Sequence, residues 1–171
     1  ILNDVPEISR AFMYYVEPAI VNYNDKFFRE EIRLADSALW EMFTFNFIQG
    51  NPDDAFDQVN SIVITENLAG KYFGEENPMG KVLRINDEQS YQVTGVIREI
   101  PKNSTFRFDL CIPFENIRKF GHSYFDYGWN SYFCYVELRP GTDYRELNGK
   151  IKDFLMIKSR DPSQASDDSS E

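Results

Sequence analysis

The stretch from Ser61 to Phe108 constrains the fold of this chain more than any other part of the sequence. Ser61–Ile64 is a short apolar run, which is typical of a buried strand. Thr65 can cap a helix that we expect from Glu66 to about Phe73. Gly74 follows, and glycine is common just past the end of a helix. The stretch therefore begins with a strand that leads into a capped helix.

A hairpin is predicted directly after this helix. Lys81–Ile85 and Tyr91–Ile97 both alternate apolar and polar residues, and the loop Asn86–Ser90 joins them. Asn77–Gly80 reads as the turn before the hairpin. Gly95 lies inside the second arm, which indicates a bulge or a close backbone approach.

The other predicted elements show no steady alternation of strand and helix. The fold class is therefore α+β, with antiparallel strand pairs and separate helices. These elements are a helix from Asn3 or Asp4 to about Phe12, a turn at Asn22–Asp25, a strand at Glu30–Ala35, a helix at Ala38–Phe43, a helical turn at Pro52–Phe56, a turn at Pro101–Ser104, a strand at Phe106–Ile112, a helix at Pro113–Phe120, a strand at Ser131–Leu138, and a last helix capped by Thr142 or Asp143 that carries Leu147, Ile151, Phe154 and Leu155 on one face.

Composition excludes two classes of protein. Hydrophobic residues make up 42% and aromatic residues 16%, more than a disordered chain carries. The net charge of −10 lacks the basic footprint of a nucleic-acid binder. The sequence contains no apolar run of the length that spans a bilayer, and it begins at Ile1, so we expect a fragment of a longer precursor. Residues 159–171 are rich in Ser and Asp, and we expect a disordered tail or linker there.

Nothing in the sequence predicts a catalytic, cofactor-binding or metal site. His122 is the single histidine, and neither a nucleophile elbow nor a phosphate-binding loop is present. Cys111 and Cys134 lie in apolar runs that favour buried free thiols, although a pairing between them is left open. The candidate acids all fall in predicted loops, where carboxylates are simply solvated; they are Asp53, Asp54, Asp57, Glu75, Glu76, Asp87 and Glu88.

Five short motifs follow one another at close spacing between Ser61 and Asp109, and together they resemble the MacB-like periplasmic core domain of the permease family that also contains FtsX-like permeases. The motifs are a strand running into TE-x-LA and FG, a P-x-GK turn, a V-x-GV strand and an IP-x-NS corner. Phe45 to Gly50 adds a weaker match upstream. The residues that carry the resemblance are Thr65, Glu66, Leu68, Ala69, Phe73, Gly74, Pro78, Gly80, Lys81, Val93, Gly95, Val96, Pro101, Asn103 and Ser104, and they read as fold determinants.

The resemblance implies a non-catalytic domain on the periplasmic side of the inner membrane, inserted between transmembrane helices of its own permease chain. It implies a porter-like lobe at residues 1–48 and 131–158, and an inserted sabre-like lobe at residues 49–130. A cytoplasmic ATPase, a second permease protomer and envelope proteins are the implied partners, and ATP-driven motion is the implied role. The alternative is a stand-alone envelope module that binds a peptide or lipid in an aromatic cleft around Tyr124–Tyr135. The transported substrate is left open.

Overall fold

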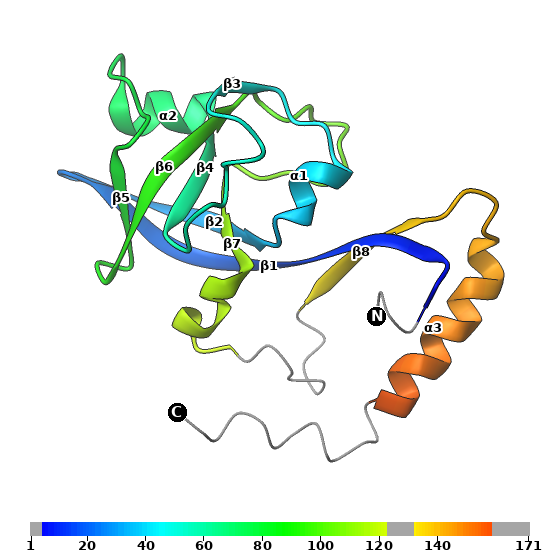
Figure 1. The fold of residues 1–171 in the computed structure, drawn as a ribbon. Helices are drawn as coiled ribbons and strands as arrows, with labels where there is room; N and C mark the ends of the chain where they lie inside the picture. The colour runs from blue at the N-terminus through cyan, green and yellow to red at the C-terminus, as the bar shows by residue number, and fades with distance from the viewer. Residues whose placement is uncertain (1–4, 123–131, 159–171) are drawn as a thin grey trace.

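The computed structural model describes residues 5–122 and 132–158, and it confirms the α+β class. One mixed sheet dominates, with a few short helices on its outside (Figure 1). In chain order the elements are β1 (Ile8–Tyr23), β2 (Lys26–Ala35), α1 (Ala38–Met42), β3 (Phe47–Gln49), β4 (Ser61–Thr65), α2 (Glu66–Phe73), β5 (Val82–Ile85), β6 (Gln89–Ile97), β7 (Leu110–Pro113), a 3-10 helix (Phe114–Phe120), β8 (Phe133–Leu138) and α3 (Tyr144–Lys158).

Six strands of this sheet close into a small barrel. Hydrogen bonds pair β1 with β2, β2 with β7, β7 with β4, β4 with β6, β6 with β5, and β5 with β1 again. β3 adds to β6 outside this ring. Closure leaves few free strand edges, which is one way that an all-paired sheet avoids exposing its backbone groups.

The inside of the barrel is the main hydrophobic core. Alternate strand residues point inward, among them Val21, Ile62 and Ile85, and all three are fully buried. The apolar face of α2 packs against this core, and the 3-10 helix adds Phe114 and Ile117 to it. In Figure 1, α2 lies at the upper end of the barrel and the 3-10 helix at its lower end.

A second core consists of aromatic side chains on the outside of the barrel. Trp40 of α1 lies at its centre, with ring contacts to Phe45, Phe47, Phe56 and Phe108 at centroid distances of 5.0–6.2 Å. Edge-to-face pairs of this kind stabilise a core beyond the area that they bury. The members of this aromatic cluster are Phe12, Tyr14, Trp40, Phe43, Phe45, Phe47, Phe56, Phe106, Phe108 and Tyr135.

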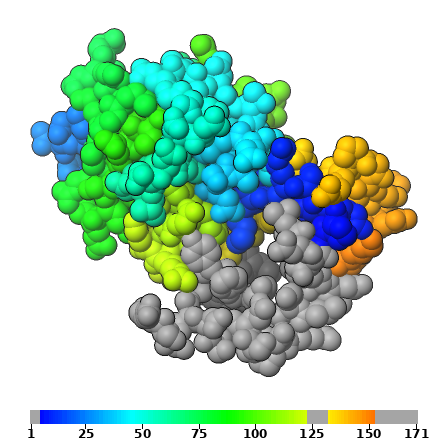
Figure 2. All heavy atoms as spheres, viewed as in Figure 1, coloured from blue at the N-terminus to red at the C-terminus, as the bar shows by residue number. Residues whose placement is uncertain are grey.

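β1 extends beyond the barrel at both of its ends. Residues from Ile8 to Tyr14 pair with β8, whereas residues from Tyr14 to Tyr23 pair with β2. The tip of the β1–β2 hairpin projects past the barrel at the left of Figure 2. At the other end, α3 packs Leu147 and Ile151 against the β1–β8 ribbon. Within the described ranges, no helix combines the length and the apolar character needed to cross a membrane.

Most predicted elements are confirmed, with shifts at their ends. The helix Glu66–Phe73, the hairpin of β5 and β6, the strand at Glu30–Ala35 inside β2 and the last helix are all present. The turn at Asn24 and Asp25 joins β1 to β2. Residues 159–171 lie outside the described residues.

Three predictions are wrong. The helix expected up to Phe12 is instead the start of β1, because β8 offers hydrogen-bond partners from Ile8 onward. The strand expected from Phe106 begins only at Leu110, because Phe106 and Phe108 pack into the aromatic cluster. Residues 52–56 form turns and no helix.

Candidate functional site

The start of α2 is tied to two other segments by the first motif residues. The Thr65 side chain accepts a hydrogen bond from the Leu68 amide at 3.4 Å, as a helix cap does. Its own amide donates to the Asp109 carbonyl at 2.8 Å. Glu66 accepts from the Glu99 amide, and the Glu99 carboxylate accepts from the amide of Asn67, both at 3.2 Å. These bonds hold the α2 N-terminus against the chain that leaves β6.

The P-x-GK turn is hydrogen-bonded to β6 and to the tip of the β1–β2 hairpin. The Gly80 amide donates to the Val93 carbonyl, and the Val93 amide donates to the Lys81 carbonyl, both at 2.8 Å. The Lys81 ammonium binds the Glu76 carboxylate and the Tyr23 hydroxyl. The hydrogen bond from Lys81 lowers the pKa of Glu76, and the pKa of Lys81 is raised in return. Lys81, which directly precedes β5, thus connects the turn after α2 with the end of β1.

Gly95 is the point of closest packing in the motif. A β-carbon there would lie 2.7 Å from the Phe47 ring and 3.4 Å from Val63, so the close approach predicted from the sequence is confirmed. The β4–β6 ladder also shifts register beside it, between Ile62 and Val63. Gly95 therefore lets the aromatic cluster approach β6.

The remaining motif residues lie in the core or in turns. The Gly74 amide donates to the Gly70 carbonyl and ends α2, and the Pro78 carbonyl accepts from the Lys81 amide. The Ser104 amide donates to the Pro101 carbonyl, while the Asn103 side of that turn is exposed. The buried members among these remaining residues are Leu68, Ala69, Phe73, Pro78, Val93 and Val96. All fifteen are spread around the barrel, and none lines either of the two recesses described next. Their role as family determinants stays a prediction.

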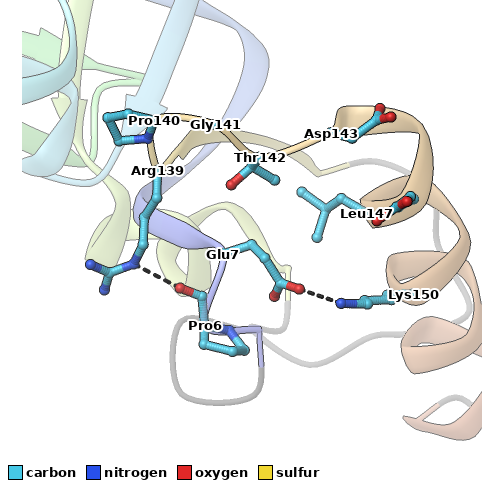
Figure 3. A pocket seen from close by; sticks show the side chains of 10 residues that line it. Pro6, Glu7, Arg139, Pro140, Gly141, Thr142, Asp143, Leu147 and Lys150 are labelled. Atoms are coloured by element: carbon cyan, nitrogen blue, oxygen red, sulfur yellow. Dashed lines mark hydrogen bonds and ion pairs between the residues drawn. The ribbon is translucent and has the colours of Figure 1, made fainter.

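The larger recess, of about 520 Å³, lies between the start of β1, the β8–α3 turn and α3. Figure 3 shows Glu7 pointing toward Lys150 of α3, and Arg139 reaching the main chain at Pro6. The Arg139 side chain donates to the Pro6 carbonyl at 2.7 Å, and its amide donates to the Glu7 carbonyl at 2.8 Å. The Lys150 ammonium binds the Glu7 carboxylate. We call these contacts the β1–α3 junction.

The charged groups of the junction form an ion pair that stabilises the contact between β1 and α3. The hydrogen bond from Lys150 lowers the pKa of Glu7, and the same bond raises the pKa of Lys150, so both groups are charged near neutral pH. Leu147 is buried beside them, and Asp143 accepts from the Arg145 amide at the first turn of α3. The charges of Glu7 and Lys150 neutralise each other, and Arg139 donates to a main-chain carbonyl. Such an arrangement is suited to holding two elements together.

The second recess, of about 260 Å³, lies beside β2 and the chain after β6. Arg33 and Arg107 line it together with Glu31, Glu99 and Asp109. The Arg33 guanidinium lies 3.6 Å from the Glu31 carboxylate. Burial, and then the nearby Glu99 and Glu30, raise the pKa of Asp109. Positive and negative side chains both line the recess, so it favours neither an anionic nor a cationic ligand.

The candidate acids do not meet in one place. Asp87 binds the Asn22 amide group at 2.7 Å, Glu76 binds Lys81, and Asp54 binds Asn51. Asp53, Asp57, Glu75 and Glu88 are exposed. In residues 5–122 and 132–158, no three His, Cys, Asp or Glu side chains are grouped to hold a metal ion.

His122 lies against β1. Its Nε2 is 3.2 Å from the Glu17 carboxylate, and its ring packs on Tyr15 at a centroid distance of 4.7 Å. The expected aromatic cleft around Tyr124–Tyr135 falls largely outside the described residues. At its described end, Tyr135 stacks on Phe12 at 5.3 Å inside the aromatic cluster, whereas Phe133 is exposed.

The prediction for the two cysteines is half right. Both are free thiols, and Cys111 is fully buried, which raises its pKa. Cys134 is exposed, contrary to the prediction. Its apolar neighbours suggested a core strand, but in the described chain β8 pairs only with β1 and therefore lies at the edge of the sheet.

Sequence reasoning missed the β1–α3 junction. Glu7 and Lys150 are separated by 143 residues, and Arg139 and Pro6 by 133. Single charged residues at such separations carry no local pattern. The one available signal was the turn at Arg139–Gly141, which marks the end of a strand but does not say what packs on it.

Comparisons with known proteins give one matching family model and several solved structures of the same fold. The family model of the MacB-like periplasmic core domain matches residues 1–154. No curated protein sequence shows a significant match. Three solved structures share the fold. A permease-protein domain from Porphyromonas gingivalis has a TM-score of 0.74 at 23% identity, with 94% of this chain and 68% of that chain covered.

The other two structures are more distant in sequence. The periplasmic region of MacB from Actinobacillus actinomycetemcomitans has a TM-score of 0.68 at 16% identity, covering 90% of this chain and 69% of its own. The extracellular domain of the noncanonic ABC-type transporter YknZ from Gram-positive bacteria has a TM-score of 0.61 at 17% identity, covering 89% and 73%. At these identities the likeness shows the fold.

Proposed function

The chain belongs to the MacB-like periplasmic core domain family, and from this premise we propose that it is the extracytoplasmic domain of an ABC transporter permease. The domain is non-catalytic and passes ATP-driven motion of the membrane helices to the export or release of a substrate. It stands on the periplasmic side of the inner membrane. Its partners are the transmembrane helices of its own chain, a cytoplasmic ATPase, a second permease protomer and envelope proteins.

The observation that carries this proposal is the continuity of β1. The strand starts at the β1–α3 junction, pairs with β8, and continues without a break into the barrel wall. A displacement applied at the junction would therefore reach the barrel through one strand and two ladders of hydrogen bonds. Packed elements of this kind move as rigid bodies between discrete arrangements.

We also keep, as a proposal, the division into a porter-like lobe at residues 1–48 and 131–158 and a sabre-like lobe at residues 49–130. Three ladders cross this boundary: β1 pairs with β5, β2 pairs with β7, and Phe47 of β3 pairs with Ile97 of β6. The lobes would then be coupled by backbone hydrogen bonds, so we expect them to move together.

Distance measurements on the full-length permease test the proposal. Nitroxide labels are placed at Glu88, in the exposed β5–β6 turn, and at Asn148, on the exposed side of α3, after Cys134→Ser removes the exposed thiol. ATP binding should change the Glu88–Glu88 distance between two protomers and leave the Glu88–Asn148 distance within one protomer unchanged. Identical inter-protomer distances in both nucleotide states, while ATP is hydrolysed, would refute it.

The junction supplies a matched pair of variants. Lys150→Glu places two like charges together at Glu7, whereas Lys152→Glu makes the same charge change on an exposed residue two positions away. Only Lys150→Glu should uncouple ATP hydrolysis from the change in distance. The parent reading frame offers a separate check, because flanking apolar segments of about twenty residues are expected there.

A further inference from the structure

The ladder between β1 and β5 closes the barrel, and we call it the closing seam. It contains only two residue pairs, Val21 with Ile85 and Asn22 with Arg84. The ladder between β4 and β7 also has two pairs, whereas the other four ladders of the barrel have four or more. Strands are held together pair by pair, so these two ladders are the candidates for the place where the barrel opens first.

Burial distinguishes the two short ladders. All residues of β4 and β7 are buried, because the main core lies on one side of them and the aromatic cluster on the other. At the closing seam, Val21 and Ile85 are fully buried on the inner side, but Ile20 is 44% exposed and Arg84 is exposed on the outer side. Water therefore reaches one side of the closing seam, which makes it easier to open than a ladder that is buried on both sides.

The turn after β5 adds three hydrogen bonds to the closing seam. The Asn86 amide donates to the Ile20 carbonyl at 2.8 Å, and the Asn86 side chain accepts from the Ile20 amide at 3.0 Å. The Asp87 carboxylate accepts from the Asn22 side chain at 2.7 Å. Two adjacent turn residues thus continue a ladder that has only two strand pairs of its own.

Two features raise the energy of the closed seam. Asn86 and Asp87 have φ angles of +52° and +59°, in the left-handed region that costs an ordinary residue energy. Asn22 is only 7% exposed, and its side-chain oxygen is buried without a hydrogen-bond partner. A buried acceptor of this kind loses its hydration when the structure closes and regains it when the structure opens.

We propose that the closing seam is a latch, at which β5 and its turn leave β1 as one unit while the β4–β7 ladder stays closed. Opening exposes Val21 and Ile85 to water, so the open form is a minor population. β1 keeps its pairs with β2 and β8. The closing seam lies between the two proposed lobes, so its opening frees one side of the sabre-like lobe. The inference rests on the hydrogen bonds of the barrel and not on the transmission of motion.

Amide hydrogen exchange of the 171-residue chain, followed by NMR residue by residue, tests the latch. The amides of Ile20 and Asn86 both bond across the closing seam. The Thr65 amide donates to the Asp109 carbonyl and reports on the β4–β7 side of the barrel. We expect similar protection factors at Ile20 and Asn86, at least roughly tenfold below that of Thr65.

Two glycine variants supply a matched comparison. Asp87→Gly removes the carboxylate that binds Asn22, but it suits the positive φ and leaves the amides of Ile20 and Asn86 with their acceptors. Asn24→Gly makes a similar change at a φ of +52° in the turn between β1 and β2, outside the closing seam. Because a hydrogen bond to a charged group is lost, Asp87→Gly alone should speed exchange at both seam amides roughly tenfold and leave Thr65 unchanged.

Several results would overturn the inference. Equal protection at Ile20, Asn86 and Thr65, or equal acceleration of all three in Asp87→Gly, would mean that the barrel opens only as a whole. Faster exchange at only one of the two seam amides would indicate fraying of a single bond. Equal effects of Asp87→Gly and Asn24→Gly would assign the change to glycine itself. The nitroxide distances expected for the full-length permease do not depend on any of these outcomes, so the two proposals fail separately.

Discussion

Replacing Gly50 with alanine should destabilise the chain more than the same replacement at other glycines. Gly50 follows β3 with a φ of +75°, where a β-carbon is strained. That β-carbon would also lie 2.5 Å from the Thr94 carbonyl oxygen and 3.1 Å from the Gly95 α-carbon. Both are main-chain atoms of β6, which is held on one side by β4 and cannot retreat.

The size of the effect follows from these two sources of strain. A left-handed conformation costs an ordinary residue about 1–2 kcal/mol. Forcing a methyl group into a packed site costs about 1–3 kcal/mol. Together the free energy of unfolding should fall by about 2–5 kcal/mol. For a chain of this size, the melting temperature should drop by about 4–20 °C.

Three more alanine variants separate the two sources. Gly121 has a φ of +79° with nothing within 4 Å of a β-carbon, so Gly121→Ala should show the backbone cost alone. Gly70, inside α2, has neither problem, and Gly70→Ala should raise stability by about 0.5–1 kcal/mol. The β-carbon of Gly95→Ala would lie 2.7 Å from the Phe47 ring and 3.4 Å from Val63, and Phe47→Leu should relieve the closer contact.

Urea unfolding followed by circular dichroism measures all four variants in the 171-residue chain. The expected order of stability is Gly70→Ala above wild type, then Gly121→Ala, then Gly50→Ala. A Gly50→Ala variant that is no less stable than Gly121→Ala would contradict this expectation, because the contact with the Thr94 carbonyl would then have no energetic cost.

Three further outcomes are expected. In urea unfolding, Thr65→Ala should lower the free energy of unfolding by about 1 kcal/mol, because the hydroxyl group that accepts from the Leu68 amide is lost. Thr65→Ser keeps this hydroxyl group and should largely keep the stability. Iodoacetamide should label exposed Cys134 in the folded chain and buried Cys111 only after unfolding, as mass spectrometry would show; equal labelling rates would contradict the burial of Cys111. The Glu7–Lys150 pair should stabilise the contact between β1 and α3 above the ordinary pKa of Glu, about 4.3, and below that of Lys, about 10.4, because the pKa of Glu7 is lowered and that of Lys150 is raised. NMR shifts of the Lys150 side chain should therefore change as the pH falls through the pKa of Glu7, and Glu7→Gln should remove this part of the pH dependence.

The local elements of the fold could be predicted because their signals are local. Thr65 and Gly74 bracket α2, and the alternation on either side of the β5–β6 turn marks a hairpin. The crowding at Gly95 was also predictable, since a glycine inside a strand has few other uses. What could not be predicted was which distant segments share a surface. The sequence pattern around Phe106 predicts a strand, and only the structure shows that its ring packs into the aromatic cluster.

The same limit explains the edge position of Cys134 and the junction of Glu7 with Lys150. An apolar run such as Phe133–Leu138 has the composition of a core strand whether it has one neighbour or two. Burial depends on the number of neighbours, which is a property of the sheet and not of the strand. The opposite case is given by Ile20 and Phe27, whose apolar side chains are typical of a core although both are exposed in the structure.

β1 joins these observations into one mechanical argument. Its sixteen residues serve three neighbours in turn, β8 along the first half and β2 with β5 along the second. A shift of β1 along its own axis would break the register with all three at once, so the strand can move only together with them. If the domain transmits motion as proposed, a displacement that enters at the β1–α3 junction reaches the turn between β1 and β2 through this one strand.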